Sequence, residues 1–139
     1  MIKRIVLISC SSQKLGKRVK ARELYVSTLF KLNLKYANKL TPDHIFILSA
    51  KYGLVCLEQE IEPYNQTLNI MSSSEVKKWA NQILIQLRKY CSTEEAEFIL
   101  LASERYRKYL LPHLKNIQIP LQGLGIGKQI QKLKQLTDE

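Results

Sequence analysis

Short apolar runs recur along the chain and lack the periodicity of a helix. Residues 2–9, 44–50 and 97–102 are three such runs, rich in Ile, Val, Leu and Phe, and 117–121 is a fourth, shorter one. A short apolar run of this kind is typical of a strand that is buried on both faces of a sheet. We therefore predict a sheet of about four to five strands.

Segments with helical periodicity separate these runs. Residues 20–40 repeat Leu, Tyr and Ala at helical spacing, and 126–137 is a basic segment that follows "GLGIG". Ser72 and Glu75 have the spacing of a capping box, which predicts the start of another helix. A short helix is also expected within 103–115. The sequence thus predicts four helical segments between and after the strands.

The order of these elements predicts an α/β fold with helices on both faces of a mainly parallel or mixed sheet. We expect a single domain over residues 1–139, because neither a repeat nor a linker interrupts the chain. The connection 51–69 shows little regular pattern. Long irregular connections inside compact domains are uncommon and often functional, so this segment is a candidate part of a site.

The chain carries a formal net charge of +10, which is large for 139 residues. A positive field attracts polyanions, so we expect a nucleic acid or a nucleotide as partner. No apolar run reaches the roughly 20 residues that span a membrane, and no signal peptide is recognisable. We expect a cytoplasmic protein that does not contact membranes, and the oligomeric state stays open. Acidic residues form two clusters, which predicts a positive field concentrated on one face: Glu58, Glu60 and Glu62, and Glu94, Glu95 and Glu97.

Polar residues follow three of the predicted strands. Ligands of such sheets bind beyond the carboxyl ends of the strands, so we expect these residues to share one site. Small hydroxyl side chains let backbone N–H groups approach an anionic ligand closely, and lysine adds positive charge. The substrate-binding candidates in the three clusters are Cys10, Ser11, Ser12 and Lys14, then Ser49, Lys51 and Tyr52, and then Ser103 and Tyr106.

Histidine and cysteine spacing does not indicate a metal site, a catalytic triad or a disulfide framework. His44 lies at the start of a strand and His113 follows a proline, so both are expected to be structural. "GLGIGK" lacks the spacing of a phosphate-binding loop and is interpreted as a turn before a helix. Cys10 stays an alternative nucleophile or peroxide sensor, because it lies at a strand end with Lys14 nearby.

Three stretches of the sequence resemble the YaaA family, and more closely its short stand-alone relatives. They are "LISCSSQKL" at 7–15, "LSAKYGLVCLEQEIEPYNQTL" at 48–68 and "LLASERYRKYLLP" at 100–112, in the family's order. The resemblance implies a YaaA-like fold around a curved sheet. It also implies DNA binding and protection from oxidative damage. Related domains occur in archaeosine synthase-type tRNA-modification proteins, so relatives of this family are associated with modified bases.

The association of these relatives with modified bases suggests chemistry that is directed at a nucleobase. Hydrolysis of an N-glycosidic bond needs a pocket for the base, an aromatic face and a carboxylate that directs water or stabilises the sugar cation, and it needs no metal or redox cofactor. We expect an N-glycosidase that removes a modified base from a nucleic acid, in defence or in response to DNA damage. The candidate carboxylates are Glu62 and Glu104. The candidates to hold the base are Tyr52, Tyr64 and Asn65, and those to hold phosphates are Lys14 and Lys51.

Two other functions fit the same residues. A basic α/β protein of the oxidative-stress type can bind DNA without chemistry, and a small nucleotide hydrolase can use the same pocket. The DNA contact of the YaaA family lies in an insertion for which this chain has no room, so the basic segments 14–22 and 128–134 would replace it. We expect DNA rather than RNA. The nucleic-acid-binding candidates are Lys17, Arg18, Lys20, Arg22, Lys128, Lys132 and Lys134.

Overall fold

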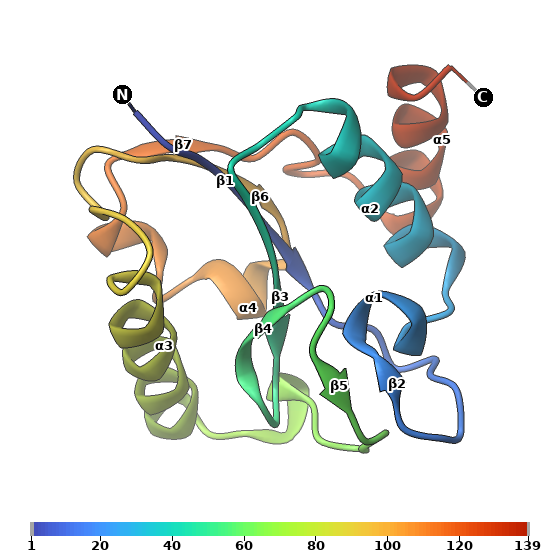
Figure 1. Ribbon diagram of the computed structural model, residues 1–139, viewed down its shortest axis with the longest axis horizontal. Helices are drawn as coiled ribbons and strands as arrows, with labels where there is room; N and C mark the ends of the chain where they lie inside the picture. Colours follow the sequence, from blue (N-terminus) through green and yellow to red (C-terminus); the bar gives the residue numbers. More distant parts are fainter. Residues whose placement is uncertain (1, 139) are drawn as a thin grey trace.

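The computed structural model describes residues 2–138 and contains a five-stranded mixed sheet (Figure 1). Its strand order is β4 (Gly53–Cys56), β3 (His44–Ser49), β1 (Arg4–Ser9), β6 (Glu97–Leu101) and β7 (Asn116–Gln118). The pairs β1–β3, β1–β6 and β6–β7 are parallel, and β4 is antiparallel to β3. The predicted fold class is therefore confirmed, with β1 at the centre of the sheet.

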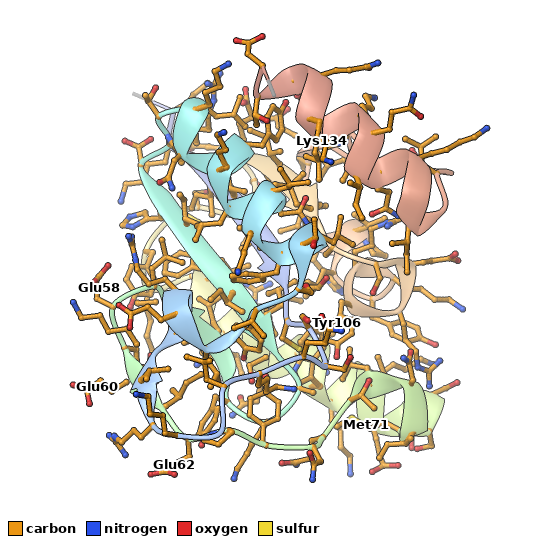
Figure 2. The ribbon with its side chains drawn as sticks, turned by 90° about the vertical axis from the view of Figure 1, so that its right-hand side faces the viewer. Glu58, Glu60, Glu62, Met71, Tyr106 and Lys134 are labelled. Atoms are coloured by element: carbon orange, nitrogen blue, oxygen red, sulfur yellow. The ribbon has the colours of Figure 1, made fainter. Side chains whose placement is uncertain are left out.

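Helices cover both faces of this sheet. On one face α2 (Thr28–Lys39) and α5 (Ile126–Leu136) lie side by side (Figures 1 and 2). On the other face lie α3 (Ser73–Leu87) and the short α4 (Glu104–Arg107). Ser72 caps α3 through the predicted capping box with Glu75.

The central strands supply most of the core. The side chains of Ile5 to Ile8 in β1 are fully buried, as are Phe98 and Leu100 in β6. Parallel strands that are covered on both faces have this continuous apolar sequence, and an alternating one belongs to sheets with a solvent face. The predictions of strands at 2–9, 44–50 and 97–102 therefore agree with the structure to within two residues at each end.

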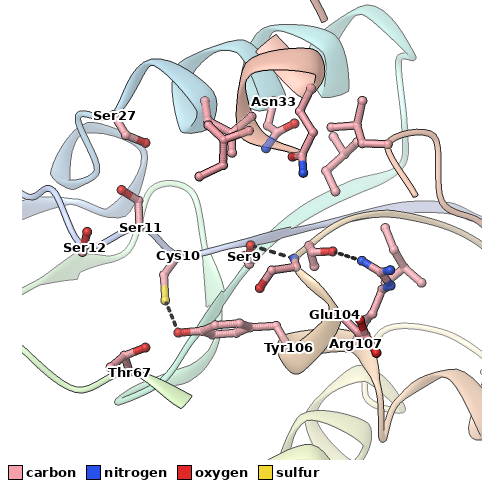
Figure 3. Close-up of a pocket in the computed structure, with 18 of the residues that line it drawn as sticks. Ser9, Cys10, Ser11, Ser12, Ser27, Asn33, Thr67, Glu104, Tyr106 and Arg107 are labelled. Atoms are coloured by element: carbon pink, nitrogen blue, oxygen red, sulfur yellow. Dashed lines mark hydrogen bonds between the residues drawn. The ribbon is translucent and has the colours of Figure 1, made fainter. Parts of the chain in front are cut away.

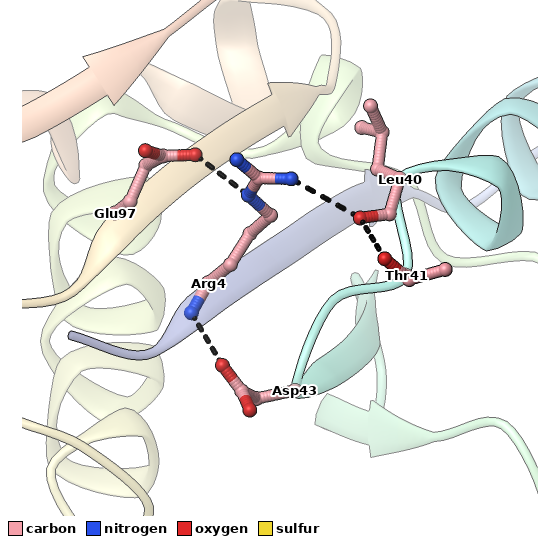
Figure 4. A network of polar contacts seen from close by, with 5 residues as sticks. All are labelled: Arg4, Leu40, Thr41, Asp43 and Glu97. Atoms are coloured by element: carbon pink, nitrogen blue, oxygen red, sulfur yellow. Dashed lines mark hydrogen bonds and ion pairs between the residues drawn. The ribbon is translucent and has the colours of Figure 1, made fainter. Parts of the chain in front are cut away.

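A single arginine ties the amino end of β1 to its neighbours (Figure 4). Arg4 pairs with Glu97 of β6 at 2.9 Å and donates to the carbonyl of Leu40 at 3.1 Å. Its backbone N–H also donates to the Asp43 carboxylate at 2.7 Å. An exposed ion pair of this kind adds little stability by itself. Together with the two hydrogen bonds it connects the start of β1 to β6 and to the segment before β3. These contacts lie at the edge opposite the loops that follow β1 and β6.

The predicted single helix over residues 20–40 is wrong. The chain instead forms β2 (Val19–Lys20), α1 (Ala21–Leu24) and, after an extended break, α2. The break exists because the segment pairs with the loop after β1, through Leu15 N–H to Leu24 O at 2.9 Å and Val26 N–H to Gln13 O at 2.9 Å. Ser27 then starts α2 afresh by accepting from the N–H of Phe30.

The connection 51–69 is more regular than its sequence suggests. Its first part turns back as β4, and β5 (Glu60–Ile61) then pairs antiparallel with β2 in a separate two-stranded sheet. Two 3₁₀ turns, η1 (Leu68–Ile70) and η2 (Leu111–His113), complete the described elements. The predicted strand at 117–121 is confirmed as a strand but lies earlier, as β7.

Gly53 makes the β3–β4 turn possible. Its φ is +75°, and a Cβ added there would lie 2.7 Å from Oε1 of Gln86, the atom that accepts from the N–H of Leu54. We expect Gly53→Ala to lower the free energy of unfolding by about 1–2 kcal/mol. Gly127→Ala is the matched control, because Gly127 lies inside α5 with open space around it, and should raise stability by about 0.5–1 kcal/mol. Urea unfolding of both variants measures the difference, and equal effects would contradict this account of the turn.

Candidate functional site

A cavity of about 860 Å³ opens at the carboxyl ends of β1 and β6 (Figure 3). One part of its lining consists of residues 9–14, at the end of β1 and in the loop after it. Another consists of residues 102–104, 106 and 107, which follow β6 and include the start of α4. Residues 65–69 close one side, and α2 and α5 contribute apolar side chains to another. This is the edge at which parallel sheets bind ligands, and the volume lies in the range of small-molecule sites.

Hydrogen bonds join the first and third polar clusters at this edge. The N–H of Ser103 donates to Ser9 Oγ at 3.4 Å, and the thiol of Cys10 donates to the Tyr106 hydroxyl at 3.3 Å. The same hydroxyl accepts from the N–H of Leu68 at 3.4 Å, which connects the segment 65–69 to these two clusters. Burial is the main reason that the pKa of Tyr106 is raised to about 12, so its hydroxyl keeps its proton at neutral pH.

Glu104 is the only carboxylate among the described residues that line this cavity. It is the first residue of α4 and is exposed to solvent. Arg107, one turn later, also lines the cavity, and its guanidinium donates to the carbonyl of Ala102 at 2.6 Å. Arg105 does not line the cavity, and its guanidinium donates to the carbonyls of Leu68 and Met71. These bonds fix α4, and with it the backbone of Glu104, against both the sheet and the 65–71 segment.

The second polar cluster lies beneath the site instead of inside it. Ser49 is fully buried and donates to the Tyr64 hydroxyl at 2.8 Å, and that hydroxyl is 2.5 Å from the hydroxyl of Tyr25. Burial raises the pKa of both tyrosines well above the usual range. A buried network of neutral hydroxyl groups of this kind holds the long connection against α1.

Lys14 links this network to the site. Its ammonium lies 4.4 Å from the centre of the Tyr64 ring, a cation–π contact. Burial lowers the pKa of Lys14. The side chain lines the large cavity and also a neighbouring hollow of about 350 Å³, and Ser12 and Asn65 are shared in the same way. A cation that lines two adjacent hollows is placed to meet an anionic group of a ligand.

Four of the predicted catalytic and substrate-binding residues line neither hollow: Ser49, Lys51, Tyr52 and Glu62. Glu62 is exposed and its carboxylate is 3.8 Å from the guanidinium of Arg18. Tyr52 donates to the carbonyl of Glu62 at 3.4 Å and packs edge-on against Tyr64, and the Lys51 ammonium lies over the Tyr52 ring at 5.3 Å. The expectation that the second cluster shares the site is therefore wrong, because none of its three residues lines either hollow. Ser49 is connected to the smaller hollow through its hydrogen bond to Tyr64, which lines it.

The basic segment near residue 20 is paired with acidic residues. Lys20 and Arg22 both contact Glu58, at 3.0 Å and 2.8 Å, and Arg18 contacts Glu60 at 3.6 Å. Figure 2 shows Glu58, Glu60 and Glu62 together on this side of the molecule, far from Lys134 on α5. The expectation that acidic and basic residues occupy separate faces is wrong here, because β2 and β5 pair and bring the two charge runs together. Among the α5 lysines, Lys132 donates to the carbonyl of Pro120 at 2.6 Å.

The sequence interpretation missed the contributions of α2 and α5. Asn33 and Leu29 of α2 line the cavity, as do Gln129 and Ile130 of α5. A signal for Asn33 exists, since a polar residue stands between apolar neighbours on the buried stripe of a helix. The position of α5 beside α2 depends on long-range packing and has no local signal.

Within residues 2–138, the His, Cys, Asp and Glu side chains form no group of three or more that is suited to a metal ion. His44 stacks on Phe46 and contacts Tyr90, a packing role in agreement with the prediction. No helix of the described part of the chain has the length and apolar character needed to cross a membrane.

Comparison with known proteins gives one match. No curated protein matches the chain, and no solved structure matches it. The model of a family described as "Family of unknown function (DUF6884)" matches residues 5–135, which include every element of the sheet except the first residue of β1. The chain belongs to this family of unknown function, DUF6884.

Proposed function

We propose that the protein hydrolyses the N-glycosidic bond of a nucleotide unit held in the cavity at the carboxyl ends of β1 and β6. One observation carries the proposal. The hydroxyl-rich loop after β1, with Lys14, and the loop after β6 meet in one cavity, and Glu104 is the one carboxylate among the described residues that line it. A site of this composition matches what the reaction requires: apolar walls for a base, a cation for phosphate and a carboxylate near the sugar.

Each group has a role in this reaction. The bond between C1′ of the sugar and the base nitrogen breaks, and water adds to C1′. Glu104 accepts the proton of that water and stabilises the positive charge that develops on the sugar. The departing base takes up a proton from solvent, and Lys14 holds the phosphate. The step consumes only water.

A base within DNA is the first substrate that we propose, reached by extrusion of the nucleotide into the cavity. The YaaA-like resemblance and the net charge of +10 support it. Lysines of α5 would then contact the flanking backbone, since α5 forms a wall of the cavity. A cytoplasmic setting fits this substrate.

A free nucleotide is the second candidate. The ion pairs of Arg18, Lys20 and Arg22 with acidic side chains favour it, because these pairs remove much of the cationic surface that a long polyanion needs.

The test is release of free base. The protein is incubated with DNA and RNA that contain natural and modified bases, and with free nucleotides, and the products are measured by mass spectrometry. Free base from at least one substrate is expected, and the substrate that yields it separates the two candidates. Tight binding of DNA that weakens steeply with salt, without release of base from any substrate, would instead identify a non-catalytic binding protein and refute the proposal.

A further inference from the structure

The Asn33 carboxamide has an unsatisfied buried oxygen. Among the described residues, its Oδ1 is the one fully buried side-chain oxygen or nitrogen without a hydrogen-bond partner. Asn33 is only 5% exposed and lines the large cavity, and Figure 3 shows its side chain projecting from α2 toward that cavity. Folded proteins rarely leave such an acceptor unpaired. An acceptor left unpaired beside a cavity indicates that a ligand supplies the donor.

The surroundings of Asn33 suit a flat heterocycle. Leu29 lies one helical turn before Asn33 on α2, and Ile130 of α5 lines the same cavity. Gln129 lies beside Ile130 on α5, and its Nε2 donates to the carbonyl of Leu124 at 2.7 Å, which fixes its carboxamide. Apolar side chains on two helices with a few polar groups are the usual lining of a site for an aromatic ligand.

We propose that Asn33 recognises the base of the substrate: its Oδ1 accepts a hydrogen bond from an N–H group on the edge of a heterocyclic base that lies between α2 and α5. This inference rests on the proposed function for the class of ligand and adds the residue that selects it. Asparagine reads base edges in this way elsewhere, with its oxygen on an N–H and its amide on a neighbouring acceptor. A site built around such a bond rejects an analogue whose N–H is blocked, because the oxygen is then left unpaired.

Asn33→Leu tests the assignment, because leucine has a similar size and lacks the acceptor. The probes are the common ribo- and deoxyribonucleoside 5′-monophosphates, and binding is measured by calorimetry on the full chain. We expect the tightest-binding nucleotide to lose about tenfold or more in affinity, the loss that follows from one hydrogen bond to a buried partner. The melting temperature of the free protein should stay the same or rise, because the variant removes an unpaired buried acceptor. Asn38→Leu, the same change at an exposed position of α2, should alter neither quantity.

The two readouts separate recognition from a structural role. Unchanged nucleotide affinity in Asn33→Leu would overturn the proposal, and so would a fall in the melting temperature of the free protein, since that indicates an acceptor already satisfied. Wild-type protein that binds none of the probes would overturn it as well. Failure of the proposed function looks different: nucleotide binding that depends on Asn33, without release of base, leaves the recognition role intact and refutes only the hydrolysis.

Discussion

Replacement of Glu104 by glutamine is expected to reduce base release by about 10²- to 10⁴-fold, the range in which a positioned general acid or base contributes. The amide has almost the shape of the carboxylate but neither accepts a proton from water nor carries negative charge toward the sugar. Glu104 is an exposed residue at the start of α4, so the fold should be unaffected. Initial rates of base release, measured by mass spectrometry, give the comparison.

Glu62→Gln is the matched control for this experiment. Glu62 was the other candidate carboxylate in the sequence, and the structure places it outside the cavity, near Arg18. Its variant should release base at the wild-type rate. Equal rates for wild type and Glu104→Gln would show that Glu104 is not the catalytic carboxylate. A loss confined to Glu62→Gln would instead make Glu62, near Arg18, the catalytic carboxylate.

Lys14→Gln is expected to weaken binding of a nucleoside 5′-monophosphate by about tenfold to a hundredfold, because a hydrogen bond to a charged group contributes about 1.5–3 kcal/mol. The corresponding nucleoside, which has no phosphate, should bind the variant and the wild type almost equally. The reason is the position of the Lys14 ammonium, over the Tyr64 ring and between the two hollows. Calorimetric titration with the nucleotide and with the nucleoside measures both affinities.

Lys17→Gln removes the same charge from an exposed position of the neighbouring loop, outside both hollows. Nucleotide affinity should therefore hardly change in this variant. A similar loss in both lysine variants would mean that the general positive field, and not a local contact, attracts the phosphate. A loss of nucleoside binding in Lys14→Gln would place this lysine at the base or the sugar.

Local sequence predicts the central strands well because their pattern has a local cause. A strand that is buried on both faces must be apolar at every position, and Ile5 to Ile8 satisfy this requirement without reference to the rest of the chain. The capping box at Ser72 is local too. The break before Ser27 is not local, because it depends on backbone pairing with Gln13 and Leu15, residues of another loop.

The residues of the site likewise fall into two groups: those that the order of the elements predicts and those that depend on packing between distant parts of the chain. The clusters at Ser11 and Glu104 meet because β1 and β6 are parallel neighbours whose carboxyl ends lie at one edge, and the order of strands and helices predicts such an arrangement. Tyr52 follows a strand as well, but it lies in the tight turn from β3 into antiparallel β4, which directs it away from the cavity. Asn33 enters the site only because α2 packs over the sheet beside α5.

The central claim is that one nucleotide unit binds at the carboxyl ends of β1 and β6. A crystal structure of the Glu104→Gln variant with its tightest-binding nucleoside 5′-monophosphate tests it most directly. We predict the base between α2 and α5 with an N–H on Asn33, the sugar beside position 104 and the phosphate at Lys14. A nucleotide bound elsewhere on the molecule, with this cavity empty, would contradict the account.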